Sequence, residues 1–191
     1  MTEDHSQGGP PVAQPPLAQA PQANFVSPKT VAIYGVLTAL TAAITIITVI
    51  PFPPTKGYFN LGEAMVFFSA LIFGWRAGAI CGGVGSAIAD VIIGYGYFAP
   101  ITLTAKGVEG LVTGTIARLN GGKKWSSVLG IFCGGSCMVS IYFLAEVIIL
   151  DTGIGYALSE MLTVNIPQVA IGGTLGFVLA HYVRKSIRLP K

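Results

Sequence analysis

Charged residues are scarce in this chain. Only 10% of its 191 residues are Asp, Glu, Lys or Arg, whereas about 25% are charged in an ordinary soluble domain. Hydrophobic residues make up 52%, and the mean hydropathy is +0.70. Several apolar runs are long enough to cross a hydrocarbon core of about 30 Å, so the composition favours an integral membrane protein over a soluble domain. The net charge of +3 is too small to indicate a nucleic-acid partner.

Cysteine and the common nucleotide-binding and catalytic motifs are equally sparse. The three cysteines, Cys81, Cys133 and Cys137, lie inside apolar runs and do not indicate a disulfide framework. Cys133 and Cys137 are four residues apart, but no histidine or third cysteine lies near them to complete a zinc site. The chain has no Walker A motif and no convincing nucleophile–base pair. We therefore expect no enzyme activity, no metal and no cofactor.

Apolar runs between polar or Pro/Gly-rich loops predict six membrane-spanning helices. They cover residues 31–50, 61–73, 77–93, 101–119, 126–150 and 164–183. Residues 154–162 are expected to form a separate interfacial helix. The polar, Pro-rich residues 1–28 predict a disordered cytoplasmic tail rather than a signal peptide. Residues 29–185 then form the membrane domain, and residues 186–191 form a short basic tail.

Basic residues gather on one side of this six-helix arrangement. The opposite side carries Lys56 as its one basic residue, together with Asp151 and Glu160. The positive-inside rule therefore predicts that both termini are cytoplasmic. The expected fold is an all-α integral membrane protein, a compact bundle of six transmembrane helices that crosses the plasma membrane several times. The nine basic residues on the predicted cytoplasmic side are Lys29, Arg76, Arg118, Lys123, Lys124, Arg184, Lys185, Arg188 and Lys191.

Polar groups inside the apolar helices are the strongest functional signal. An ionisable group in hydrocarbon costs about 2.5–3.5 kcal/mol, so such groups turn toward each other, toward water or toward a ligand. In the predicted topology, the second to the sixth helix each contribute a polar group near the outer surface. This convergence predicts one outward-facing pocket, covered by the loop before residue 61 and by the loop at residues 95–98. The expected substrate-binding residues are Phe59, Asn60, Glu63, Asp90, Tyr97, Lys106, Glu109, Tyr142, Glu146, Asn165 and Gln168.

Two alternatives remain open for the ionisable residues. Lys106 could pair with Asp90 or Glu109 in a network that only holds the bundle together, and Glu146 is a further candidate partner. Asp90, Lys106 and Glu109 could also form a proton or ion relay in a self-sufficient channel or secondary transporter. Dependence on partner subunits would distinguish such a transporter from a substrate-binding subunit.

Residues near the start of the second helix also have open roles. Tyr58 and Phe59 suit either an interfacial aromatic belt or a lid over the pocket. Glu63 could act only as a carboxylate favoured by the helix dipole. Aromatic rings together with carboxylates and amides nonetheless suit a planar heterocycle, which stacks and forms hydrogen bonds at its edges.

A stripe of small residues follows one face of the first predicted helix. Gly35, Ala39 and Ala43 are spaced four residues apart, and small residues allow helix backbones to approach closely in a membrane. The stripe predicts a helix–helix contact, either with another helix of this chain or with a partner protein. The spacing does not choose between the two.

Two stretches of the chain resemble a known family. YFNLGEAMVFFSALIFGWRAGAICGGVGSAIADVI and APITLTAKGVEGLVTG are similar to the substrate-binding S components of energy-coupling factor (ECF) vitamin transporters. The most specific parts are NLGEA, at residues 60–64, and KGVEG, at residues 106–110. The resemblance covers residues 31–184 and is closest to the riboflavin group, which includes hydroxymethylpyrimidine-type and pyridoxine-type members. Many relatives have Asp in place of Glu63, and the Pro-rich N-terminus is not part of the family pattern.

The resemblance implies a non-enzymatic vitamin-binding subunit. Such a subunit works with a transmembrane coupling protein and two ATPase subunits, and it topples in the membrane to carry its vitamin inward. S components dock through an Ala-x-x-x-Ala motif in the first helix, which Ala39 and Ala43 match. The sequence does not choose among riboflavin, hydroxymethylpyrimidine and pyridoxine.

Overall fold

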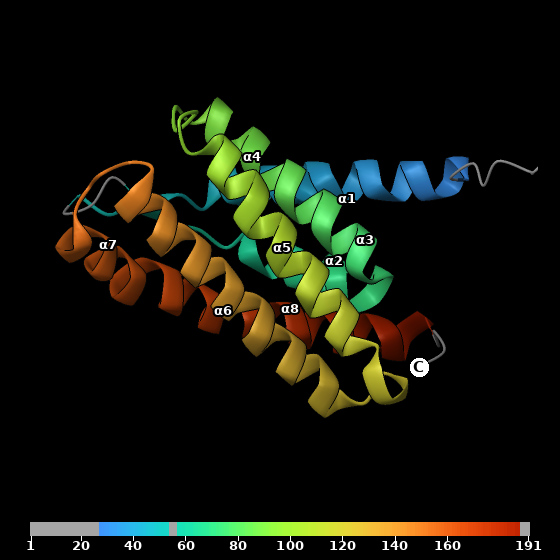
Figure 1. Ribbon diagram of the computed structural model, residues 1–191. Coiled ribbons are helices and arrows are strands. Elements are labelled where there is room, and N and C mark those ends of the chain that lie inside the picture. The colour runs from blue at the N-terminus through green and yellow to red at the C-terminus, as the bar shows by residue number, and fades with distance from the viewer. Residues whose placement is uncertain (1–26, 54–56, 188–191) are drawn as a thin grey trace, which may run out of the picture.

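The computed structural model describes residues 27–53 and 57–187, and these residues are mostly helical (Figure 1). Residues 1–26 of the predicted tail, Lys56 and residues 188–191 lie outside the described residues. The described α- and π-helices form six continuous segments, in the order that the apolar runs predict, and a short 3₁₀ helix, η2 (Leu119–Gly121), lies between the fourth and fifth of them. In chain order they are α1 (Pro28–Ile47); α2 (Glu63–Phe73); α3 (Trp75–Ala77), η1 (Gly78–Gly82) and α4 (Gly83–Ile92); α5 (Ala99–Ala117); α6 (Lys124–Ile148); and α7 (Ile154–Glu160), η3 (Met161–Asn165) and α8 (Ile166–Ile187).

Three of the described helical stretches are long and apolar enough to cross a membrane by length and composition. They are Pro28–Ile47, Lys124–Ile148 and Ile154–Ser186. The last of these shows that the expected separate helix at residues 154–162 is wrong, because α7, η3 and α8 run on without a break. Pro167 removes one backbone donor near the start of α8. The π-helical turn η3 immediately before it accommodates the interruption, so the helix continues.

The loop between α1 and α2 adds a small sheet that the all-α expectation did not include. Strands β1 (Ile50–Pro51) and β2 (Tyr58–Phe59) pair antiparallel, with Ile50 opposite Phe59. The loop also bonds to the end of α1, because the backbone N–H of Leu61 donates to the Thr48 hydroxyl at 2.8 Å. We call the described residues of this loop, 50–53 and 57–59, the hairpin.

Helix α5 lies at the centre of the bundle and packs against α6, α4, η1 and α2, while α8 packs against α2. Glycine makes the closest of these approaches possible. A Cβ atom on Gly78 of η1 would lie 2.6 Å from the carbonyl oxygen of Gly110 in α5. Only a residue without a side chain allows this contact, which is how small residues draw membrane helices together.

Hydrogen bonds from two arginine side chains show which helix ends lie together. Arg118, just after α5, donates to the Phe73 carbonyl at 2.8 Å, and Arg184 of α8 donates to the Leu71 carbonyl. The C-terminal ends of α2, α5 and α8 therefore meet at one end of the bundle, near the described C-terminus (Figure 1). We call this the basic end, because it carries seven of the nine basic residues that were predicted to face the cytoplasm; the other two, Arg188 and Lys191, lie outside the described residues. The hairpin and α7 lie at the opposite end, which we call the pocket end.

Candidate functional site

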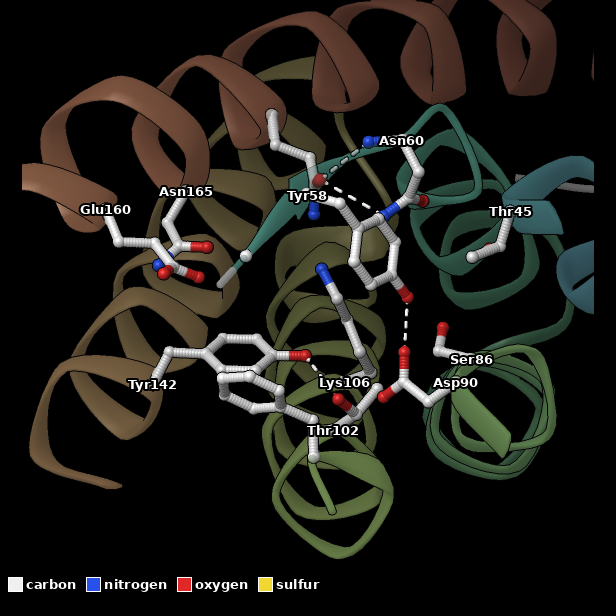
Figure 2. A pocket seen from close by; sticks show the side chains of 13 residues that line it. Thr45, Tyr58, Asn60, Ser86, Asp90, Thr102, Lys106, Tyr142, Glu160 and Asn165 are labelled. Atoms are coloured by element: carbon white, nitrogen blue, oxygen red, sulfur yellow. Dashed lines mark hydrogen bonds between the residues drawn. The ribbon is translucent and has the colours of Figure 1, made fainter. Parts of the chain in front are cut away.

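A small cavity lies at the pocket end, between the hairpin, α4, α5, α6 and the helix from α7 to α8 (Figure 2). Its volume is about 40 Å³, whereas small-molecule sites typically measure about 300–1,000 Å³. A ring-sized ligand therefore requires one wall to move. All lining residues except Gly57 and Phe98 carry a polar side-chain group. The lining residues are Thr45, Gly57, Tyr58, Asn60, Ser86, Asp90, Phe98, Thr102, Lys106, Tyr142, Glu160, Asn165 and Gln168.

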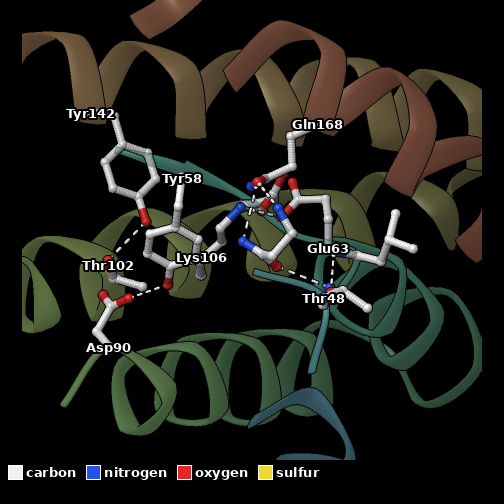
Figure 3. A network of polar contacts seen from close by, with 12 residues as sticks. Thr48, Tyr58, Glu63, Asp90, Thr102, Lys106, Tyr142 and Gln168 are labelled. Atoms are coloured by element: carbon white, nitrogen blue, oxygen red, sulfur yellow. Dashed lines mark hydrogen bonds and ion pairs between the residues drawn. The ribbon is translucent and has the colours of Figure 1, made fainter. Parts of the chain in front are cut away.

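Lys106 is the centre of a buried ion-pair network (Figure 3). Its ammonium group donates to Glu63 Oε2 and lies 3.6 Å from Glu109 Oε2. All three side chains are almost completely buried. Lys106 thus pairs with Glu63 and Glu109, rather than with Asp90 or Glu146, in the described structure. Glu63 lies at the first position of α2, where the helix dipole favours a carboxylate. It has a further role, because it neutralises the buried ammonium group of Lys106.

Tyr58 joins the hairpin to α4. Its hydroxyl donates to Asp90 Oδ1, and its ring packs edge-on against Tyr95 with the ring centroids 4.9 Å apart. Burial, followed by the Asp90 carboxylate, raises the pKa of the Tyr58 hydroxyl above its usual value. The hydroxyl therefore stays protonated at physiological pH and remains a donor. Tyr58 lines the cavity instead of serving only in an interfacial aromatic belt.

Asn60 and Gln168 join the residues after the hairpin to α8. Gln168 Oε1 accepts the backbone N–H of Asn60 at 3.0 Å and its side-chain Nδ2 at 3.1 Å. Asn60 Oδ1 in turn accepts the N–H of Gly62 at 2.9 Å. These three bonds fix the base of the hairpin at the start of α2.

The π-helical turn η3 brings Glu160 and Asn165 to the same cavity. Residues five apart lie about 140° apart around an α-helix, whereas the wider turn of a π-helix brings them toward one face. Figure 2 shows both side chains on the same side of the cavity as Tyr142. The amide nitrogen of Asn165 is buried and has no hydrogen-bond partner in the part of the chain that the structure describes. Glycine at position 57 allows the hairpin to approach, because a Cβ there would lie 2.7 Å from Glu160 Oε2.

Tyr142 completes the wall formed by α6. Its hydroxyl donates to Thr102 Oγ1 at 2.9 Å, and the Lys106 ammonium lies 5.9 Å from the centroid of its ring. The cavity therefore combines an aromatic face, buried charge and amides from several helices.

The structure brings together six of the eleven expected site residues as cavity lining: Asn60, Asp90, Lys106, Tyr142, Asn165 and Gln168. Glu63 and Glu109 lie behind Lys106 as its partners. Glu146 is fully buried but does not line the cavity, and neither do Phe59 and Tyr97. Tyr97 is 50% exposed.

The expected substrate-binding residues did not include the other seven lining residues, although Tyr58 and the loop with Phe98 were expected to cover the pocket. These seven are Thr45, Gly57, Tyr58, Ser86, Phe98, Thr102 and Glu160. A signal existed for Thr102, because it lies four residues before Lys106 on the same helix face. Glu160 had no such signal, since its orientation depends on η3 and on the continuous helix that follows.

The small-residue stripe lies on the outer face of α1. Gly35, Ala39 and Ala43 are exposed, and a Cβ on Gly35 would meet no atom within 4 Å. The buried residues of α1 lie elsewhere on the helix: Leu37, Thr41, Ala42 and Thr45. Within the described part of the chain, the stripe therefore does not serve to pack α1 against another helix.

Comparison with known proteins connects this site to a family. Residues 25–188 match the family described as ECF-type riboflavin transporter, S component. A protein of Pyrococcus woesei, described as an uncharacterized protein in gap 3'region, is 37% identical over 144 residues. That match covers 72% of this chain and 94% of the relative. The family match does not favour the self-sufficient channel or transporter. The chain belongs to the ECF-type riboflavin transporter S-component family, and it is a non-enzymatic membrane subunit for vitamin uptake.

Proposed function

We propose that this chain binds riboflavin, or a related heterocyclic vitamin or precursor, in the cavity at the pocket end. The loaded subunit then passes the vitamin to a transmembrane coupling protein with two ATPase subunits, which drive import with ATP. The observation that carries the proposal is the convergence of polar side chains from the hairpin and from helices α4, α5, α6 and α8 on one cavity. Substrate-binding residues that are distant in sequence would have to meet in this way.

The charge distribution supports an outward-facing cavity. Six helical segments place both described termini at the basic end, and Asp151 and Glu160 belong to the opposite end. By the positive-inside rule, the basic end faces the cytoplasm. We therefore propose six transmembrane helices in the plasma membrane, with the cavity open toward the outside.

The charges around the cavity favour an uncharged ligand with N–H or O–H donors. Lys106, the cation in the cavity lining, is already paired with Glu63 and Glu109. The lining also contains two acidic residues, Asp90 and Glu160. Riboflavin, hydroxymethylpyrimidine and pyridoxine all offer such donors, whereas their phosphate esters would bring negative charge to a site that is rich in carboxylates.

The hairpin is the wall best placed to move. It contributes Tyr58 to the cavity and has few buried apolar residues of its own. Its base is fixed by Asn60 and Gln168, while Tyr58 provides the bond across the cavity. Opening at Tyr58 would enlarge the cavity without disturbing the helix bundle, which supports the interpretation of this loop as a lid.

The exposed stripe on α1 supports docking to the coupling protein. A row of Gly and Ala that faces outward gives a partner helix close access to the backbone. We propose that Gly35, Ala39 and Ala43 form this docking face.

Reconstituted transport tests the proposal. The chain is placed in proteoliposomes with or without the coupling protein and ATPases, and uptake of radiolabelled riboflavin, hydroxymethylpyrimidine and pyridoxine is measured with and without ATP. The proposal predicts uptake of one vitamin only when both the partners and ATP are present. Uptake by the chain alone, driven by an ion gradient, would contradict it and would support the ion-relay alternative.

A further inference from the structure

A second hollow lies at the basic end, between α2, α6 and α8, and shares no lining residue with the vitamin cavity. Its apolar walls come from α2 and α8. Its polar lining consists of Lys124, Ser127, His181 and Arg184. The described lining of this hollow contains a lysine, an arginine and a histidine, and it contains no acidic side chain. The cavity at the pocket end, in contrast, is lined by the acidic residues Asp90 and Glu160.

The hydroxyl of Ser127, which lines this hollow, has no hydrogen-bond partner among residues 27–53 and 57–187. The residue is 2% exposed. Elsewhere on α6, Ser136 and Ser140 donate to the carbonyl four residues earlier at 2.8 Å. Ser127 lies in the first turn, where the Lys123 carbonyl already accepts two backbone N–H groups at 3.0 and 3.3 Å. A ligand oxygen at this point would satisfy the free hydroxyl.

The surroundings of Ser127 favour an anion. Helix α6 is 25 residues long, begins at Lys124 and has no side-chain cap at its N-terminus. The N–H groups of Ser126 and Ser127 are already bonded to the Lys123 carbonyl, so what the helix offers an anion at the hollow is chiefly the positive end of its dipole. Arg184 is held in place by its bond to the Leu71 carbonyl, and its guanidinium group has further N–H donors.

Two tryptophans indicate the depth of this hollow in the membrane. Trp125 follows Lys124 directly and is 53% exposed. Trp75, at the same end of the bundle, is 41% exposed, and the centroid of its ring lies 5.0 Å from the guanidinium carbon of Arg76. Exposed tryptophans beside basic residues are typical of the interface at which lipid headgroups lie.

We propose that this hollow binds a phosphate group and that its occupant in the membrane is the headgroup of an anionic phospholipid. The phosphate accepts a hydrogen bond from the Ser127 hydroxyl at the positive end of the α6 dipole, and Lys124, His181 and Arg184 surround its charge. A bound headgroup links the ends of α2, α6 and α8. This site is independent of the vitamin that the pocket end takes.

Tryptophan quenching tests the site directly. The purified full chain in detergent is titrated with phosphatidylglycerol or phosphatidylcholine that carry the same brominated acyl chains. We expect saturable quenching by phosphatidylglycerol at a concentration about tenfold or more below that needed for phosphatidylcholine. Equal quenching by the two lipids would overturn the proposal.

Soluble competitors identify the source of the phosphate. If glycerol 3-phosphate competes only weakly, a preference for phosphatidylglycerol supports the lipid as occupant. Strong competition by inorganic phosphate without any lipid preference would assign the hollow to free phosphate and overturn the lipid assignment. Binding of a Glu-rich peptide in preference to phosphatidylglycerol would assign it to a protein partner, and this too would overturn the proposal.

Matched variants separate a built site from diffuse positive charge. Ser127→Ala and Lys124→Gln should each weaken phosphatidylglycerol binding by about fivefold or more, whereas Ser136→Ala and Lys185→Gln should change it by less than about twofold. Ser136 belongs to the same helix and Lys185 is an exposed neighbour of Arg184, but neither lines the hollow. Equal losses in Lys124→Gln and Lys185→Gln, or no loss in Ser127→Ala, would contradict the site.

Discussion

The phenol of Tyr58 donates a hydrogen bond to the carboxylate of Asp90, which lies 32 residues later in the chain. This bond spans the side of the cavity between the hairpin and α4 (Figure 2). Because the cavity measures about 40 Å³, entry of a heterocycle requires a wall to move, and we propose that the hairpin is the wall that opens. In our account, the Tyr58–Asp90 bond holds the lid closed.

Tyr58→Phe should therefore accelerate ligand exchange. The substitution removes a hydrogen bond to a charged group, which is worth about 1.5–3 kcal/mol. We expect the rate constant for vitamin dissociation, measured by stopped-flow fluorescence, to rise about tenfold or more. Tyr97→Phe is the control, because Tyr97 is half-exposed and does not line the cavity. An unchanged dissociation rate in Tyr58→Phe would remove Tyr58 from the lid.

Lys106→Met should destabilise the fold. Loss of the ammonium group leaves Glu63 and Glu109 buried without their cation, and breaking a buried ion pair typically costs about 3–5 kcal/mol. We expect the midpoint of thermal unfolding in detergent to fall well below that of the unmodified chain. Lys185→Met, at an exposed lysine, should leave it nearly unchanged. Equal stability of both variants would show that the Lys106 network does not hold the bundle together.

Ala39→Trp should abolish transport while vitamin binding persists. Ala39 is exposed at the middle of the small-residue stripe, so an indole there blocks a partner helix without entering the cavity. ATP-driven uptake and equilibrium binding are measured on the same preparation. Leu144→Trp, at an exposed position on α6, is the matched control and should keep both activities. Parallel loss of uptake and binding in Ala39→Trp would contradict the docking role.

Asn165→Ala should weaken vitamin binding by about tenfold or more, on the order of 1.4 kcal/mol. The side chain is 4% exposed, and its amide nitrogen has no partner within the described residues, so it is available to a ligand. Isothermal titration of the purified chain measures the change. Thr163→Ala is the control from the same π-helical turn, because the Thr163 hydroxyl is exposed and bonded to the Ser159 carbonyl. Unchanged affinity in Asn165→Ala would place the pocket elsewhere.

Helix positions and the convergence of polar groups could be predicted from the sequence, because both depend on local patterns. Apolar run length located the first five helical segments to within a few residues, whereas the last segment begins at Ile154, well before the predicted start at residue 164. Ionisable groups that face hydrocarbon cost free energy, so they were expected to turn toward the interior of the bundle. Asp90 and Lys106 do so and line one cavity. Whether these residues contact a vitamin stays a prediction.

Specific pairings could not be predicted, because they depend on helix rotation and backbone irregularity. Glu63 proved to be a partner of Lys106 only once the packing of α2 against α5 was known. Glu160 faces the cavity because η3 widens the helix, and a π-helical turn has no reliable sequence signature. The role of Tyr58 depends on the two-residue strands of the hairpin, which are too short for a periodic pattern.

Equilibrium binding of a vitamin panel to the purified chain, without any partner subunit, tests the central claim most directly. Quenching of intrinsic tryptophan and tyrosine fluorescence would be recorded for riboflavin, hydroxymethylpyrimidine and pyridoxine, each beside its phosphate ester. The account predicts tight, saturable binding of one unphosphorylated ring compound and much weaker binding of its ester. No binding across the panel, by a chain shown to be folded by circular dichroism, would contradict the account.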